Sequence, residues 1–460
     1  MIEFRGYFKN SFFLSVGSAF PVLASFSLVA VYTKYLSPEE YGYTDLISTF
    51  VAIAVPVFSL QIYDGLQMFL LKKKAEASQI LTNVFVVIVL GLFLSLSFYP
   101  LLEYFFLDFT DYLFIILIIT SIRGVALSYF IGLDKVKYSS FSSIIESSFL
   151  VVFSLFFIVY KQEGVNGFFY SLIISRGIAL FFLLVSMRVW EQIKLNFISL
   201  SQIKELLKYS APLVLNLIGW WINSSADRFM ILSFNGIKEN GIYAAASKLP
   251  TLLLVVNSAL VSSWTITALK NYDRKNTKMF SDFFNVYFFI MFVMLIFSIL
   301  FNELFFNYYI RSSEYSTAKA IVPVLIIALF FAAFSKFYGV IYLGEENTKG
   351  ASYTTVLCAV LNIILNLIFL PILGGMGAAI ATLLSFFCIA LIRYFYVVKY
   401  TKIRVSLFQG LIVLIYLSIV TLFIFSVFST FVFVIINIVF VLFVFYKHYF
   451  HIKKFLSKKA

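Results

Sequence analysis

The chain has 460 residues, of which 62% are hydrophobic and only 12% are charged. Soluble domains carry about 25% charged residues, so this composition and a mean hydropathy of +0.98 exclude a water-soluble globular protein. The apolar residues form long runs, and a run of about 20 residues spans the hydrocarbon core of a bilayer. Because the runs do not alternate polar and apolar residues, they predict helices and not the strands of a membrane barrel.

The first apolar run, Phe12 to Tyr35, is longer than the core of a signal peptide and has no small-residue cleavage site after it. It predicts a first membrane helix. About fourteen helices are predicted in all, and the last two are separated only near Ser429 and Thr430. Their spans are 12–35, 44–70, 80–102, 112–133, 140–160, 167–189, 209–233, 241–268, 281–302, 318–343, 350–370, 373–398, 407–428 and 430–447.

The basic residues predict the orientation, because Lys and Arg are enriched in cytoplasmic loops. With the N-terminus inside, 24 of the 35 Lys and Arg fall on cytoplasmic segments, five fall on outer segments and six fall within helices. This bias predicts that the N- and C-termini are both cytoplasmic. The net charge of +13 therefore indicates topology and contact with anionic lipid, and no nucleic-acid partner is expected.

Three pairs of landmarks recur in the same order at an offset of about 200–212 residues. They are Glu40–Gly42 with Glu239–Gly241, Gly132 and Lys137 with Gly344 and Lys349, and Gly164–Gly167 with Gly374–Gly377. Two parallel six-helix repeats predict a V-shaped cleft between two lobes, which suits alternating access. The alternative is that glycine-rich turns simply recur in helical membrane proteins.

The predicted organisation has four parts. Residues 1–189 form an N-terminal six-helix lobe, 190–208 a cytoplasmic linker, 209–398 a C-terminal six-helix lobe, and 399–460 an extra helix pair with a basic cytoplasmic tail. The linker mixes Leu, Ile and Phe with Lys and Glu, which predicts an amphipathic helix on the membrane surface. The alternative is a solvated loop.

Six cations fall within the predicted spans, where each costs about 2.5–3.5 kcal/mol unless it pairs, meets water or has a function. Five are candidates for substrate binding: Arg123, Arg176, Lys336, Arg228 and Lys248. Arg123 lies deepest, and its repeat image falls next to Lys336, so the two predict an anion site in the cleft. The alternative for Arg123 is a structural ion pair with Glu146. Arg393 lies near the inner end of its helix, and we expect it to snorkel.

Three acids are candidate coupling groups for an ion or proton gradient: Asp64, Glu146 and Asp227. A carboxylate in a low-dielectric site suits a proton carrier. For Asp227 the alternative is a structural bridge to Lys248. Trp220 and Trp221 are candidates for stacking on sugars, with packing as the other interpretation.

The sequence offers no enzyme chemistry. Cys358 and Cys388 lie in apolar runs, and the only histidines, His448 and His451, lie in the basic tail. These residues predict no metal site, no cofactor and no catalytic group. No nucleotide-binding motif occurs, and no predicted loop is long enough for the paired acids of a membrane glycosyltransferase or polymerase.

Several segments together resemble the polysaccharide transporter family of the multidrug/oligosaccharidyl-lipid/polysaccharide exporter (MOP) superfamily, and Wzx-type O-antigen or capsule flippases in particular. The segments are Leu36–Gly42 (LSPEEYG), Leu206–Pro212 (LLKYSAP), Asp227–Phe229 (DRF), Gly241–Ala245 (GIYAA) and Gly374–Thr382 (GGMGAAIAT). The likeness covers nearly the whole chain.

The resemblance implies a multi-pass protein of the bacterial inner membrane that flips undecaprenyl-pyrophosphate-linked oligosaccharide repeat units to the outer leaflet. It implies a cationic cavity, mapped here onto the five cations above, and coupling to an ion gradient. The implied partners are the lipid-linked oligosaccharide, membrane lipids, and polysaccharide polymerase and chain-length proteins. Relatives often place an Arg at the inner end of the second helix, where this chain has Gln67-Met68-Phe69.

Two transporter alternatives remain. An ion-coupled multidrug exporter would need an acidic cavity for cationic drugs, whereas cations outnumber acids in these spans. A flippase for the peptidoglycan lipid precursor would have a similar architecture and a different cargo.

Overall fold

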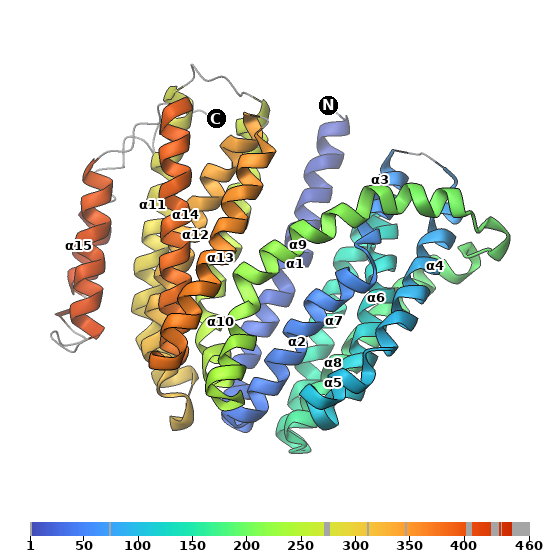
Figure 1. The fold of residues 1–460 in the computed structure, drawn as a ribbon, viewed down its shortest axis with the longest axis horizontal. Helices are drawn as coiled ribbons and strands as arrows, with labels where there is room; N and C mark the ends of the chain where they lie inside the picture. The colour runs from blue at the N-terminus through green and yellow to red at the C-terminus, as the bar shows by residue number, and fades with distance from the viewer. Residues whose placement is uncertain are drawn as a thin grey trace. The chain divides into compact units, whose positions relative to one another are not determined.

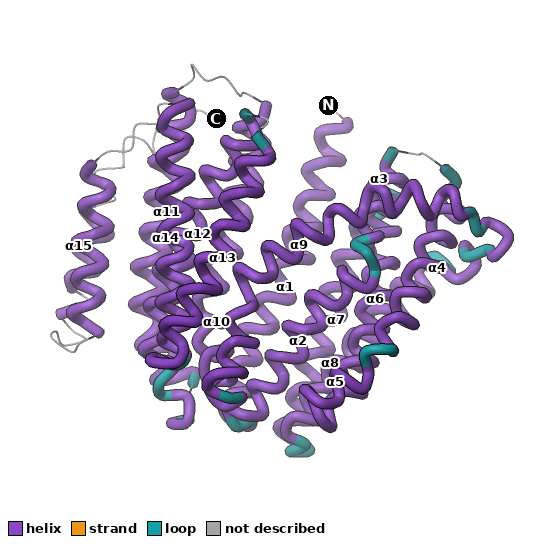
Figure 2. Tube along the Cα trace, in the orientation of Figure 1, coloured by secondary structure: helices purple, strands orange, loops and turns teal. Residues whose placement is uncertain are grey.

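The computed structural model describes residues 2–72, 75–270, 277–310, 312–345, 347–401, 407–424, 432–433 and 435–443. Figure 1 and Figure 2 show helices joined by short loops, with no strand in these ranges. Nine helices in the same ranges are long and apolar enough to cross a membrane. The predicted all-α, polytopic fold class is therefore confirmed.

The first of two compact units covers residues 1–225. Its buried core joins α3, α4 and α6 to the start of α9, through side chains that include Leu66, Leu81 and Leu206. Helix α7 packs between α1 and α8. The helices are α1 (Ile2–Tyr35), α2 (Pro38–Phe58), α3 (Ile62–Leu71), α4 (Ala77–Leu96), α5 (Tyr99–Phe106), α6 (Thr110–Gly132), α7 (Val136–Ser154), α8 (Gly164–Ser186) and the first part of α9 (Leu200–Asn235).

The second compact unit covers residues 226–460. Helix α12 packs against α10, α11, α13 and α14. Its core is aromatic: the Trp264 and Phe337 rings stack with centroids 4.7 Å apart, and the Trp264 indole donates to the Phe337 carbonyl. The helices are α10 (Ile237–Lys270), α11 (Thr277–Leu304), α12 (Ala318–Gly344), α13 (Thr348–Leu373), α14 (Gly375–Thr401) and α15 (Leu407–Ile424).

The predicted single helix over 44–70 is wrong, because the helix is interrupted between α2 and α3. Leu60 and Gln61 have φ values of 50° and 52°, a left-handed conformation that costs non-glycine residues free energy. Gly91 on α4 allows the break, since a Cβ built there would lie 1.9 Å from the Phe58 carbonyl oxygen. An apolar run does not reveal such a break, because every residue in it is compatible with a helix.

The predicted amphipathic helix over 190–208 is wrong for residues 190–199, whereas 200–208 form the helical start of α9. Two short 3-10 turns, Val189–Gln192 and Leu195–Phe197, precede α9, which begins at Leu200 and continues to Asn235 (Figure 1). The buried Asn83 side chain holds this segment: it donates to the Phe197 carbonyl and to Gln202, and accepts from the Ser199 amide. Side-chain bonds from α4 thus replace the hydrogen bonds of the expected helix. The boundary between the two compact units falls within α9, between Ser225 and Ala226.

The repeat landmarks meet in space in the same way in each unit. Gly164 is the first residue of α8 and Gly374 directly precedes α14, with φ values of 53° and 56°. A Cβ on Gly164 would lie 2.7 Å from Oε1 of Glu40, and Oε1 of Glu239 accepts from the Gly375 amide at 2.8 Å. Each carboxylate lies at a helix N-terminus, where the helix dipole favours negative charge. This shared arrangement supports the internal repeat.

Some expectations concern residues outside the described ranges. The second helix of the C-terminal pair is described only at 432–433 and 435–443, and the basic tail after residue 443 lies outside the described residues, as do Lys73, Lys74 and 271–276. The V-shaped cleft concerns the placement of the two units relative to each other and stays a prediction.

We expect Gly91→Ala to lower the apparent melting temperature of the purified protein. The added methyl group overlaps the Phe58 carbonyl, and overpacking of this kind costs on the order of 1–3 kcal/mol. Thermal unfolding in detergent measures the effect. Gly177→Ala on α8 is the control, since no atom lies within 4 Å of its Cβ position. An equal change in both variants would contradict close packing at the α2–α3 break.

Candidate functional site

Three charged side chains from consecutive helices meet inside the first unit. Glu146 on α7 lies between Arg123 on α6 and Arg176 on α8. Its Oε2 is 2.6 Å from Nη2 of Arg123, and its Oε1 is 3.1 Å from Nε of Arg176. The side chains are 17%, 12% and 22% exposed, respectively. The group, which we call the Arg–Glu–Arg cluster, therefore holds two positive charges against one negative charge in a largely buried place.

The cluster leaves hydrogen-bond donors unused. A guanidinium has five N–H donors. Arg176 uses Nε for Glu146 and Nη1 for the Thr120 hydroxyl at 2.8 Å, and no other partner is found for it in the described part of the chain. Nε of Arg123 is buried and has no hydrogen-bond partner among the described residues. Because buried polar groups are normally satisfied, these donors are candidates to bind water or an anion.

Small residues bring α7 close enough to its neighbours to place Glu146. Gly17 on α1 lies against Ser140, with a Cβ position only 2.8 Å from the Ser140 Cα. On the other side, the Ser142 hydroxyl donates to the Ala179 carbonyl of α8 at 3.2 Å. Small residues and interhelical hydrogen bonds of this kind associate helices in membranes.

Arg393 on α14 is the contrasting cation of the second unit. It is 3% exposed, so the expectation that it snorkels is wrong. Its Nε donates to Thr354, its Nη1 to the carbonyl and hydroxyl of Ser335, and its Nη2 to the Ala351 carbonyl and Thr355. All five N–H donors are therefore used on neutral oxygens of α12 and α13. Arg393 ties three helices together and has no donor left for a ligand.

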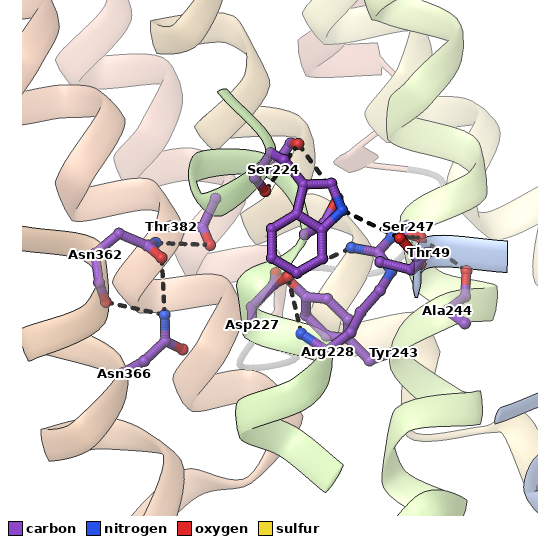
Figure 3. Close-up of polar contacts among 12 residues, drawn as sticks. Thr49, Ser224, Asp227, Arg228, Tyr243, Ala244, Ser247, Asn362, Asn366 and Thr382 are labelled. Carbon is purple, nitrogen blue, oxygen red and sulfur yellow. Dashed lines mark hydrogen bonds and ion pairs between the residues drawn. The ribbon is translucent and has the colours of Figure 1, made fainter. Parts of the chain in front are cut away.

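Asp227 is the buried acid of the second unit and is drawn in Figure 3. Its Oδ2 accepts from the Tyr243 hydroxyl at 2.5 Å, and its Oδ1 accepts from the Arg228 backbone amide at 3.0 Å. The Arg228 guanidinium lies 3.4 Å from Oδ1 and donates to the Ser247 hydroxyl at 3.3 Å. Tyr243 and the adjacent Arg228 thus fix the carboxylate. The predicted bridge to Lys248 stays a prediction.

A chain of neutral polar groups continues from Tyr243 into α13 and α14 (Figure 3). The Tyr243 hydroxyl also contacts Thr382, which accepts from the Asn362 amide at 3.4 Å. The Asn366 amide donates to the carbonyl and side-chain oxygen of Asn362, while its own Oδ1 is buried without a donor among the described residues. The sequence alone did not single out Asn362, Asn366 or Thr382. Two Asn side chains four apart in an apolar helix, on one helix face, were the available signal.

The other candidates take separate places. Lys336 is partly buried on α12 beside Ser335, and Lys248 is partly buried on α10. Asp64 is partly buried and accepts from the Gln61 amide at the α2–α3 break. The Trp221 indole donates to the Thr49 carbonyl at 3.1 Å, which favours its packing role. The structure thus joins Arg123, Glu146 and Arg176 in one unit, and Asp227 and Arg228 in the other. The predicted pairing of Arg123 with Lys336 involves both units and stays a prediction.

A bundle of apolar helices with buried charges defines a multi-pass membrane protein. Comparison with family models gives a match to the family described as polysaccharide biosynthesis protein over residues 7–266, and a second match to MatE over residues 212–368. The chain therefore belongs to the polysaccharide biosynthesis protein family. None of the curated proteins compared with it matches.

Solved structures share the fold at low sequence identity. The lipid II flippase MurJ in an inward closed conformation has a TM-score of 0.71 and 16% identity, over 96% of this chain and 99% of that one. An inward-facing multidrug resistance MATE family transporter of the MOP superfamily has a TM-score of 0.70 and 15% identity, over 84% and 98%. A MOP superfamily transporter from Pyrococcus furiosus, described as having a binding pocket of reversed polarity, has a TM-score of 0.61 and 15% identity, over 86% and 95%. The predicted family is confirmed by the family match, and the solved structures share the predicted fold.

We expect Arg393→Gln to reduce the yield and apparent melting temperature of the purified protein. The variant leaves several of the five hydrogen bonds unmade, and unsatisfied buried groups cost about 1–3 kcal/mol each. Size-exclusion chromatography after graded heating measures the loss. Arg188→Gln is the control, since Arg188 is 72% exposed and pairs only with the exposed Glu191. A variant as stable as the wild type would show that Arg393 is not structural.

Proposed function

We propose that this protein is a flippase that moves undecaprenyl-pyrophosphate-linked oligosaccharide repeat units from the inner to the outer leaflet of the bacterial inner membrane. The repeat units would serve O-antigen or capsule synthesis, and movement would occur by alternating access. The observation that carries the proposal is the Arg–Glu–Arg cluster, which keeps an excess positive charge and unused donors inside a membrane-spanning unit.

The chemistry of such a cargo fits the cluster. A diphosphate is a multivalent anion, and guanidinium groups bind phosphate oxygens through strong charge-assisted hydrogen bonds. A buried cation in a bilayer is costly, so a chain that retains two beside a single acid is expected to use them. Arg123 and Arg176 would contact the diphosphate. Lys336, Arg228 and Lys248 would add positive potential in the second unit, as the family resemblance implies.

The net charge of the cluster distinguishes an anionic cargo from a cationic one. A multidrug exporter for cationic compounds would place its excess charge on acids, whereas this cluster has an excess of cations. A flippase for the peptidoglycan lipid precursor would also use a cationic site, and it is the second candidate. The family match to polysaccharide biosynthesis proteins favours a polysaccharide repeat unit. Polymerase and chain-length proteins would then act on the product in the outer leaflet.

We expect Arg123→Gln to abolish export of the surface glycan while the protein stays in the membrane. The cluster then loses its excess positive charge, so it no longer offsets the free-energy cost of desolvating the diphosphate. Lipid-linked repeat units should accumulate on the inner face, measured by enzymatic labelling of right-side-out and inverted vesicles from the source bacterium. Lys319→Gln is the matched control, since Lys319 is 40% exposed and pairs with Glu303.

Two further measurements separate the cargoes. Rescue of cells that lack their peptidoglycan-precursor flippase would favour the second candidate, and increased sensitivity to cationic drugs on deletion would favour the exporter. Normal glycan export by Arg123→Gln would remove Arg123 from the cargo site.

Export against a gradient also needs coupling, and we propose Asp227 as the coupling group. It is the buried acid among the polar groups drawn in Figure 3. Carboxylate oxygens suit a proton or a hard cation. Glu146 neutralises one of the two cluster charges, and Asp64 lies at the α2–α3 break; these places suit coupling less.

We expect the melting temperature of the purified protein to depend on the coupling ion, and Asp227→Asn to remove that dependence. A ligand at 100 times its Kd stabilises by about 2.7 kcal/mol. Thermal unfolding in sodium chloride and in choline chloride, each at pH 6 and pH 8, distinguishes sodium from protons. Asp111→Asn is the control, since Asp111 is exposed and accepts from Tyr99. The same ion dependence in Asp227→Asn as in the wild type would exclude this assignment.

A further inference from the structure

The Glu146 carboxylate occupies the groups that a bound anion would use. Each of its oxygens lies against a different arginine, at 2.6 Å and 3.1 Å. A phosphate oxygen would bind the same guanidinium groups with the same kind of charge-assisted contact. Glu146 and the cargo's diphosphate are therefore rivals for Arg123 and Arg176.

Among the described residues, Glu146 is held by the two charges that it contacts. Ser143 and Ser147, three positions before and one after it, donate their hydroxyls to carbonyls of their own helix at 3.2 Å and 2.7 Å. In the described part of the chain, the two arginines are the partners found for the Glu146 carboxylate. Once an anion takes the arginines, no neutral donor among the described residues keeps Glu146 in place.

The fixed acids of the chain show the difference. Asp227 accepts from a tyrosine hydroxyl and a backbone amide, and Glu239 accepts from the Gly375 backbone amide. A structural counter-ion in a low-dielectric place is expected to have its remaining oxygen lone pairs satisfied in this way. Glu146 lacks this support and is 17% exposed, so its side chain can leave the arginines and return.

We infer that Glu146 is a release group, which competes with the cargo's diphosphate for Arg123 and Arg176 and so speeds the departure of the anion. The inference rests on the proposed function. Two guanidinium groups without a counter-ion would hold a diphosphate with two full charges, and slow dissociation is the usual consequence of tight binding. A carboxylate that returns as the anion leaves lowers the free-energy cost of exposing both cations.

The test measures binding of inorganic pyrophosphate to the full chain in phosphatidylcholine nanodiscs. We expect Glu146→Gln to bind pyrophosphate about tenfold more tightly, because the competing charge is worth roughly one charge-assisted hydrogen bond. The dissociation rate should fall by a similar factor. In cells, the same variant should export less glycan in spite of its tighter site. Unchanged or weaker binding would overturn the inference and make Glu146 a structural support of the arginines.

Two variants guard the result. Glu146→Asp keeps the charge but is one methylene shorter and cannot contact both arginines, so we expect a smaller rise in affinity. If Glu146→Gln does not fold, this variant decides the question, and a wild-type or lower affinity overturns the inference. Glu303→Gln breaks the ion pair with Lys319 and should leave pyrophosphate binding unchanged.

Two further arms separate the possible failures. If Arg123→Gln binds pyrophosphate as the wild type does, the cluster is not an anion site, and the proposed function loses its support. If Arg123→Gln weakens binding but Glu146→Gln does not strengthen it, only the release role is wrong. Nanodiscs with added phosphatidylglycerol test the lipid headgroup as the anion. If Glu146→Gln gains affinity only for that lipid, the release role is likewise wrong.

Discussion

The sharing of one carboxylate between two guanidinium groups is the interaction on which the functional argument depends. In a bilayer, an unpaired cation is expensive and a perfectly paired one is inert. Glu146 leaves the Arg–Glu–Arg cluster between these limits, because it neutralises one of the two charges and satisfies only part of the donors. The cluster is stable enough to persist in the folded unit and is still attractive to an anion. A second carboxylate from a neighbouring helix would have removed that property.

Arg393 shows that a buried arginine alone is no evidence of a binding site. It is more buried than either cluster arginine, yet its five donors all end on neutral oxygens of α12 and α13. Carbonyl and hydroxyl dipoles then stabilise the charge in place of a carboxylate, and the helices gain a cross-link. Donor accounting therefore separates the two roles, since burial and charge are alike in both. On the proposed function, it favours the first unit for direct contact with the cargo.

The sequence predicted the class of fold, the positions of most helices and the pairing of Arg123 with Glu146 as one of two interpretations. It did not predict the α2–α3 break, because Leu60 and Gln61 are ordinary residues and the reason lies on α4, at Gly91. It did not predict the linker, because Asn83 is far away in sequence and its side chain replaces local hydrogen bonds. Arg176 joining the cluster and Arg393 turning inward are likewise decided by contacts between helices, which hydropathy does not record.

The two units use one scaffold for different chemistry. Glu40 lies against Gly164 in the first unit and Glu239 against Gly374 and Gly375 in the second, so the same turn and carboxylate hold the start of α8 and α14. Because this turn and carboxylate are repeated, the buried charges elsewhere can differ between the two units. In the first unit two cations share an acid, and none of the described residues fixes that acid with a neutral donor. The second unit has a saturated cation and an acid fixed by Tyr243. A cargo anion and a coupling cation need opposite charges, and a duplicated frame allows a single chain to offer each of them a separate place.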